Sequence, residues 1–236
     1  MKGKQLLIYL HIPKTGGTTL TNVIEQQYQQ VHHYKEEDVA KLQKELQVAE
    51  ALCGHIPFGA HRYITRPFTY ITMLRDPVEQ VISWFYYRHQ SPYLKKFPGS
   101  LDDYLHDDQF NLTSENLQTR FICGDDPPSF KRAKANLKNY FSVVGITELY
   151  TESLFLMKKN LNWREFTITK MNVNQNRPLK NDLSKATIEK IREKNHIDLK
   201  VYDYAKQRLL QELAGFDLKT KKELALFKKT LEGDGP

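Results

Sequence analysis

The segment LLIYLHIPKTGGTTL at residues 6–20 constrains the fold of this chain more than any other part of the sequence. The apolar run Leu6–Ile12 has the length and composition of a buried strand, and Pro13 ends it. Gly16 and Gly17 then let the backbone turn tightly before an amphipathic stretch begins. This order of strand, glycine turn and helix predicts a strand-to-helix unit of an α/β protein.

The same turn has the features of an anion-binding site. Unpaired amides and the helix dipole favour a negative charge at a helix N-terminus, and Lys14 adds a positive charge there. Thr18 and Thr19 are predicted to cap the helix and to donate hydroxyl hydrogen bonds. The alternative is an ordinary strand-to-helix turn with a surface lysine. The residues predicted to bind a phosphate or similar oxyanion are Lys14, Thr15, Gly16, Gly17, Thr18 and Thr19.

Composition sets broad limits on the class of protein. A chain of 236 residues with 40% hydrophobic and 27% charged residues suits one large domain over 1–236, with a charged helical tail from about residue 216. No apolar run is long enough for a transmembrane helix, and no small-residue cleavage site follows the N-terminus, so we expect a cytoplasmic protein. The net charge of +7 would suit nucleic acid, an acidic glycan or a phosphorylated cofactor. We expect no nucleic-acid partner, and the sequence does not predict an oligomeric state.

Cysteine and acidic residues give no sign of a metal site. Cys53 and Cys123 are the only cysteines, and we expect both to be buried and unpaired. Their spacing does not resemble a zinc site, and no other ligand cluster is evident, so no metal is predicted. The carboxylates interpreted as solvated surface are Asp102, Asp103, Asp107 and Asp108.

Strand and helix patterns alternate, which predicts a mostly parallel central sheet flanked by helices. The predicted strands are Leu6–Ile12, Ala51–Ile56, Phe68–Leu74, Ser142–Ile146 and an additional one at Phe166–Lys170. The predicted helices are Thr18–Gln30, Glu36–Glu50, Val78–Arg88 with Asp76 as its cap, Leu101–His106, Glu115–Ile122, Phe130–Tyr140, Tyr150–Asn160, Leu183–Lys194 and Leu199–Leu213.

Polar residues follow three of the predicted strands. The ligands of parallel sheets bind at the carboxyl ends of the strands, where Lys14, His55 and Arg75 all fall. An arginine can hold a phosphate with two parallel hydrogen bonds, and Ser83, two helical turns later, can add a third. The alternative is that Arg75 pairs with Asp76 or a nearby carboxylate and that Ser83 is an ordinary helical residue.

Two of these segments together resemble a known family. HIPKTGGTTL followed by LRDPVEQVISWFYY resembles the sulfotransferases that use 3′-phosphoadenosine 5′-phosphosulfate (PAPS). The similarity is greatest to the glycan-modifying branch that includes the heparan sulfate and uronyl 2-O-sulfotransferases. Weaker similarities lie at residues 116–120, 144–148 and 202–204.

The resemblance implies a P-loop-containing nucleotide-hydrolase-like sulfotransferase fold, a PAPS donor and 3′-phosphoadenosine 5′-phosphate (PAP) as product. It also implies that residues 14–19 bind the 5′-phosphosulfate and that Arg75 and Ser83 bind the 3′-phosphate. In such a reaction Lys14 would stabilise the leaving phosphate. The predicted acceptor is a hydroxyl, on a carbohydrate or another small molecule, whose identity and position the sequence does not reveal.

A histidine is the predicted general base. His55 lies near the end of a predicted strand, beside Gly54, and the resemblance implies a base at a comparable strand end. His61 is the second candidate, whereas His11 is expected to be structural because it lies inside the first predicted strand. His32 and His33 are expected to be exposed.

Two other functions fit parts of the sequence. An ATP- and Mg²⁺-dependent phosphotransferase is disfavoured because a Walker A loop places its lysine after the last glycine, whereas Lys14 precedes both. A non-catalytic protein that binds a glycan or nucleotide on the same fold is also possible, although Lys14 and His55 are both present. Asn172, Asn174 and Arg177 are interpreted as residues of polar turns.

Overall fold

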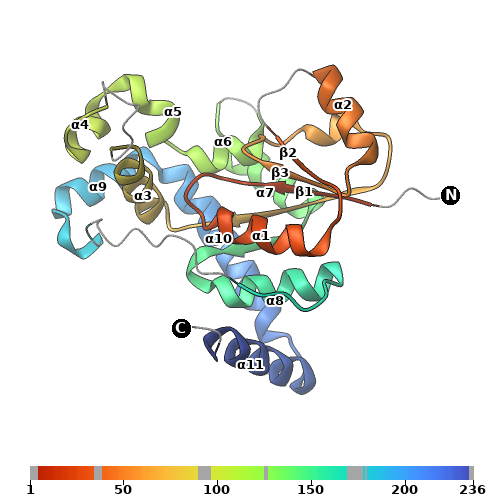
Figure 1. Ribbon diagram of the computed structural model, residues 1–236. Coiled ribbons are helices and arrows are strands. Elements are labelled where there is room, and N and C mark those ends of the chain that lie inside the picture. Colours follow the sequence, from red (N-terminus) through yellow and green to blue (C-terminus); the bar gives the residue numbers. More distant parts are fainter. Residues whose placement is uncertain are drawn as a thin grey trace.

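The computed structural model describes residues 5–34, 39–89, 97–124, 127–168, 178 and 180–233. These residues contain a five-stranded sheet in the order β2-β3-β1-β4-β5, and every neighbouring pair is parallel (Figure 1). The predicted parallel sheet flanked by helices is therefore confirmed. The strands are β1 (Leu6–Leu10), β2 (Val31–His33), β3 (Ala51–Gly54), β4 (Phe68–Leu74) and β5 (Phe141–Ile146).

The central strand β1 is buried along its whole length, from Leu6 to Leu10. An unbroken apolar run, without alternation, is expected where helices cover both faces of a parallel sheet. In register, Leu10 lies opposite Gly54 of β3 and Thr72 of β4. The residues that leave β1, β3 and β4 consequently emerge at one edge of the sheet, which we call the carboxyl edge.

The helices surround this sheet, with α7, α8 and α10 in contact with β5 (Figure 1). They are α1 (Gly17–Gln27), α2 (Val39–Val48), α3 (Pro77–His89), α4 (Leu101–His106), α5 (Asn111–Ser114), α6 (Leu117–Cys123), α7 (Phe130–Tyr140), α8 (Tyr150–Leu161), α9 (Lys185–Lys194), α10 (His196–Ala214) and α11 (Leu218–Gly233). Short 3₁₀ helices are η1 (Ala60–Tyr63), η2 (Asp108–Phe110), η3 (Thr147–Leu149) and η4 (Lys180–Asp182).

Four helices, α3, α4, α5 and α9, extend beyond the carboxyl edge and form what we call the helical lobe, at the left of Figure 1. The lobe has its own apolar cluster, in which α3, α4 and α9 contribute Ile82, Tyr104 and Ile191. Because α3 begins directly after β4, this cluster fixes the direction in which the chain leaves the sheet.

Two strand predictions differ from the structure. The short strand β2 was not predicted, and it brings His32 and His33 into an edge pairing with β3. The strand predicted at Phe166–Lys170 is wrong for 166–168, and 169–170 lie outside the described residues. Phe166 packs instead on Trp163 and Phe227, with ring centroids 6.2 and 5.8 Å away.

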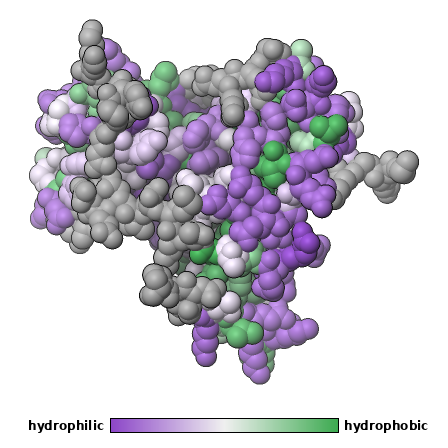
Figure 2. Space-filling view, viewed as in Figure 1, coloured by the Kyte–Doolittle hydropathy of each residue, from purple (hydrophilic) through white to green (hydrophobic). Residues whose placement is uncertain are grey.

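The charged C-terminal segment forms the helix α11, which packs on α8 through buried Phe227 (Figure 1). On the face shown in Figure 2, the coloured side chains over this part of the molecule are mostly hydrophilic, with smaller hydrophobic areas between them. Cys53 and Cys123 are buried free cysteines, as predicted. Within the described ranges, no helix combines the length and apolar composition that crossing a membrane requires.

Candidate active site

The turn after β1 has an unusual backbone. Lys14 and Gly16 have left-handed conformations, with φ of 66° and 83°, and Gly16 is the N-cap residue of α1. Where a left-handed residue adjoins a right-handed one, successive amides point into one concavity that suits an anion. Because α1 begins at Gly17, the predicted capping role of Thr18 and Thr19 is wrong, and both residues lie in the first turn.

The carbonyl groups of this turn face the protein. Each of five consecutive carbonyl oxygens, from Ile12 to Gly16, accepts a hydrogen bond from a side chain. In a trans peptide the N–H points opposite to the carbonyl, so the amides of Lys14, Thr15, Gly16 and Gly17 are directed away from these side chains, whereas Pro13 has no N–H. The bonds run from Thr15 Oγ1 to Ile12 (2.8 Å), Gln80 Nε2 to Pro13 (3.2 Å), Arg75 Nη1 to Lys14 (3.1 Å), Thr147 Oγ1 to Thr15 (2.9 Å) and the Tyr150 hydroxyl to Gly16 (2.9 Å).

These bonds also assign roles to two hydroxyl groups. The Thr15 hydroxyl is turned into the protein, so Thr15 offers a ligand its backbone amide. Burial raises the pKa of Tyr150 well above its usual range, so its hydroxyl stays protonated and remains a donor to Gly16. The turn is therefore held in place by the fold itself.

Gly17 is required by its neighbour His11. A Cβ atom at Gly17 would lie 1.7 Å from His11 Nε2, so any residue other than glycine would overlap the imidazole ring in its present position. His11 follows β1 directly, one residue past the strand, so the prediction that it lies inside the strand is wrong. Its ring stacks on Tyr9 at 5.3 Å and lies 4.4 Å from the ring of His55.

His11 is held in its neutral form. Burial lowers the pKa of His11 to about 3, and the nearby His55 and Lys14 act in the same direction. A neutral imidazole beside the lysine avoids repulsion between two positive charges.

His55 follows β3 at the carboxyl edge and is exposed. Its Nδ1 lies 2.8 Å from the carbonyl oxygen of His11. Because a carbonyl only accepts hydrogen bonds, Nδ1 must carry the proton, and the neutral ring keeps a lone pair on Nε2. This tautomer is the one that a general base needs.

Arg75 leaves β4 at the same edge. In addition to its bond to Lys14, its guanidinium approaches Glu79 Oε2 at 3.4 Å, so the predicted alternative of a nearby carboxylate partner is present. A guanidinium can hold a phosphate through two parallel N–H···O bonds, which is the role that the resemblance implies for Arg75. Ser83 lies on α3, the helix that also carries Glu79, and the residue is 8% exposed. Asp76 caps α3 as predicted, accepting from the amide of Val78 at 2.8 Å.

The lysine of the turn points towards the helical lobe. Lys14 Nζ lies 4.0 Å from the centre of the Tyr87 ring, a cation–π contact. Tyr87 is 56% exposed, whereas Phe85 is buried in the lobe. Of the aromatic run at 84–87, Tyr87 is therefore the residue that contacts the site.

His61 lies elsewhere. Its Nδ1 is 3.0 Å from the Tyr70 hydroxyl, and its ring stacks on Phe68 at 4.9 Å. Phe68 and Tyr70 are at the start of β4, so His61 sits at the amino edge of the sheet, across from Lys14. The structure thus places Lys14, His55 and Arg75 at the carboxyl edge and leaves His61 outside, whereas Ser83 lies farther along the chain, in α3, and forms no hydrogen bond with those three among the described residues.

Some residues of the site had little or no sequence signal. Thr147 falls in a weakly similar segment, but Gln80 and Tyr150 had not been singled out. Asn172, Asn174 and Arg177 lie outside the described residues. In the part of the chain that is described, no three or more His, Cys, Asp or Glu side chains are grouped as a metal site.

Comparison with known proteins identifies sulfotransferases that are similar to this chain. Mouse (Mus musculus) heparan sulfate 2-O-sulfotransferase 1 is 24% identical over 194 residues, covering 66% of this chain and 54% of the relative. Zebrafish (Danio rerio) heparan-sulfate 6-O-sulfotransferase 1-B is 25% identical over 277 residues, covering 89% of this chain and 67% of the relative. The chain thus spans about half the length of the first of these relatives.

A solved structure, mouse sulfotransferase SULT7A1 complexed with PAP, aligns with a TM-score of 0.44 and 16% identity over 70% of this chain and 61% of its own. The model of the galactose-3-O-sulfotransferase family matches residues 18–228, from the first turn of α1 into α11. This match confirms the predicted resemblance to glycan-modifying sulfotransferases. With nearly the whole described fold inside that match, the chain belongs to the galactose-3-O-sulfotransferase family.

Proposed function

We propose that this protein transfers the sulfuryl group of PAPS to a hydroxyl of a carbohydrate acceptor and releases PAP. The observation that carries the proposal is the turn after β1, where five consecutive carbonyls are bound from behind and a left-handed Gly16 opens the N-terminus of α1. A second cationic residue, Arg75, lies at the same edge. Two anion-binding elements fit a donor with phosphates on both its 5′ and 3′ positions.

Residues of the turn would hold the 5′ end of the donor. The amides of Gly16 to Thr19 are suited to the 5′-phosphate, because a helix N-terminus supplies donors and a favourable dipole. Arg75 is suited to the 3′-phosphate, and the resemblance assigns Ser83, on α3, to the same phosphate. When bound, PAPS supplies a sulfuryl group joined to a good leaving group.

His55 would act as the base. Its Nδ1–H bond to the His11 carbonyl holds the ring and leaves Nε2 to take the proton of the acceptor hydroxyl. The acceptor oxygen forms the new bond to sulfur while the bond from sulfur to the phosphate oxygen breaks. Lys14 stabilises the negative charge that develops on the phosphate, which requires it to leave the Tyr87 ring.

A carbohydrate acceptor is supported by the relatives, whose names specify sulfation of heparan sulfate. Tyr87 offers an exposed aromatic ring beside Lys14, and such a ring can lie against the apolar face of a sugar. We therefore place the acceptor between the carboxyl edge and the helical lobe.

Calorimetry with PAP and with ATP plus Mg²⁺ tests the donor. We expect PAP to bind more tightly than ATP and the affinity for PAP to fall about tenfold or more in Arg75→Ala. Lys158→Ala, which removes a lysine on α8 away from this edge, is the matched control and should not change PAP affinity. Preference for ATP with Mg²⁺ would instead support a phosphotransferase, and PAP binding without sulfate transfer to any glycan would support a non-catalytic binding protein.

A further inference from the structure

The backbone of Arg75 is held by one side chain, Gln118. The Arg75 amide donates to Gln118 Oε1 at 3.0 Å, and Gln118 Nε2 donates to the Arg75 carbonyl at 2.8 Å. One side-chain amide thus hydrogen-bonds both backbone groups of Arg75, the residue that directly follows β4. Gln118 is 1% exposed, so water does not compete for these bonds.

Gln118 is itself fixed at the start of α6. The carboxylate of Asp198, on α10, accepts from the backbone amides of Gln118 and Thr119 at 3.0 and 2.7 Å and from the Thr119 hydroxyl. A carboxylate at this position satisfies the otherwise unpaired first-turn amides of the helix. The direction of the Gln118 side chain therefore depends on α10.

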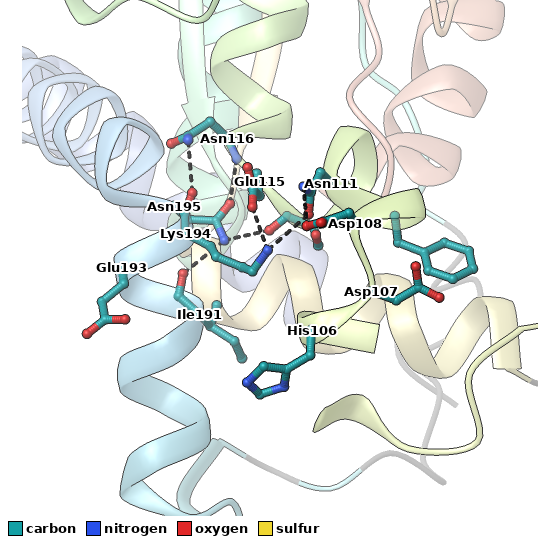
Figure 3. Close-up of polar contacts among 12 residues, drawn as sticks. His106, Asp107, Asp108, Asn111, Glu115, Asn116, Ile191, Glu193, Lys194 and Asn195 are labelled. Atoms are coloured by element: carbon teal, nitrogen blue, oxygen red, sulfur yellow. Dashed lines mark hydrogen bonds and ion pairs between the residues drawn. The ribbon is translucent and has the colours of Figure 1, made fainter. Parts of the chain in front are cut away.

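Asn116, just before α6, strengthens this junction. Its side chain accepts from the backbone amide of Ile197 at 2.9 Å and donates to the carbonyl of Lys194 at 2.9 Å. Its own amide donates to the side chain of Asn195 at 2.8 Å, and Lys194 pairs with Glu115 (Figure 3). The segment from 115 to 119 is thereby attached to the ends of α9 and α10.

We propose that Gln118 is a positioning residue for the 3′-phosphate site, because it fixes the backbone from which the Arg75 guanidinium reaches the ligand. This inference rests on the proposed function, in which Arg75 binds that phosphate. The guanidinium stands at the end of a long side chain, so a small backbone rotation at Arg75 moves it away from the ligand. The polar side chain of Gln118 can be buried because both of its polar atoms are hydrogen-bonded to the Arg75 backbone.

The test compares two ligands that differ by one phosphate, PAP and adenosine 5′-monophosphate (AMP), by calorimetry. Gln118→Met keeps the side-chain volume and removes both hydrogen bonds. We expect its affinity for PAP to fall about tenfold while its affinity for AMP stays unchanged, so that its preference for PAP resembles that of Arg75→Ala. Gln118→Glu, which can accept from the Arg75 amide but cannot donate to its carbonyl, should lose part of the preference.

Asn136→Ala is the matched control, because it destabilises α6 without removing the hydrogen bonds between Gln118 and Arg75. Asn136 donates to the carbonyl of Ile122 at 2.9 Å, at the opposite end of the same helix. This variant should lower the melting temperature and keep the full preference for PAP over AMP.

The outcomes separate the inference from the function on which it rests. If Arg75→Ala loses the preference for PAP and Gln118→Met keeps it, the positioning role is wrong and the proposed function stands. If Gln118→Met weakens PAP and AMP equally, the role is structural only, and the inference is again overturned. If Arg75→Ala keeps the preference, the assignment of the 3′-phosphate to Arg75 fails, and the inference fails with it.

Discussion

The two edges of the sheet use histidine in opposite ways. At the amino edge, His61 is bonded to the Tyr70 hydroxyl and packed among Phe58, Phe68 and Tyr140, so both its faces and one nitrogen serve the fold. At the carboxyl edge, exposed His55 is bonded through Nδ1 only to a backbone carbonyl. The difference teaches that a histidine is available as a base when its ring is exposed and a carbonyl partner fixes the proton on Nδ1, which leaves the lone pair on Nε2.

The largest expected effect is at His55. Removing a general base costs about 10²- to 10⁴-fold in rate, so His55→Ala should lose turnover in a sulfate-transfer assay by that factor. The affinity for PAP should remain unchanged, because no phosphate contact is removed. Normal turnover in this variant would mean that the base is a different residue.

Gly17→Ala tests how closely the carboxyl edge is packed. The new methyl group would overlap His11, so we expect a loss of about 1–3 kcal/mol in the free energy of unfolding and weaker PAP binding. Adding His11→Ala should restore part of both, measured by urea unfolding and calorimetry in a double-mutant cycle. Simple additivity of the two changes would contradict this contact.

His11 predicts a pH dependence of stability. Its pKa in the folded state is lowered to about 3, below the value of 6.5 expected when unfolded, so its contribution is complete above pH 6.5 and is lost as the pH falls towards 3. Between pH 7 and pH 5 this amounts to about 2 kcal/mol. Urea unfolding at both pH values should show a smaller change in His11→Gln. An equal change in both proteins would exclude His11 as the source.

At the amino edge, His61→Ala should affect the fold and spare the chemistry. We expect it to lower the free energy of unfolding by about 1–2 kcal/mol, through lost ring packing and the loss of the side-chain hydrogen bond to the Tyr70 hydroxyl, and to leave the turnover rate nearly unchanged. His61→Phe, which keeps the ring packing, should cost less. A large loss of turnover in a stably folded His61→Ala protein would remove the contrast between the two edges.

The sequence predicted those parts of the fold whose signal is local. The strand Phe68–Leu74 and the helix Phe130–Tyr140 were predicted with correct bounds. The strand β2 was missed because three residues at an edge give no periodicity. The strand predicted from Phe166 was wrong because this apolar side chain packs on Trp163 and on Phe227 of α11, which lies about sixty residues later in the chain.

In the candidate site, too, the sequence predicted what depends on local signals and missed the contacts between distant segments. Lys14, His55 and Arg75 could be placed together because parallel strands end at one edge, whereas the role of Ser83 stays a prediction. Their partners could not be predicted, since Gln80, Thr147 and Tyr150 reach the turn from distant parts of the chain. The helix cap was misplaced because the left-handed turn at Gly16 moved the start of α1 by one residue.

The row of bound carbonyls after β1 has a consequence for how this protein can evolve. Four of its five donors lie outside the turn: Arg75 between β4 and α3, Gln80 in α3, Thr147 in η3 and Tyr150 in α8. Gln80, Thr147 and Tyr150 have no phosphate contact in the proposed function, so the shape of the turn depends partly on residues that do not touch the donor. Because these side chains bind its carbonyls, the shape of the turn is set by the fold around it. Substitutions in those outlying segments would then alter donor affinity at a distance, giving selection many small ways to adjust it.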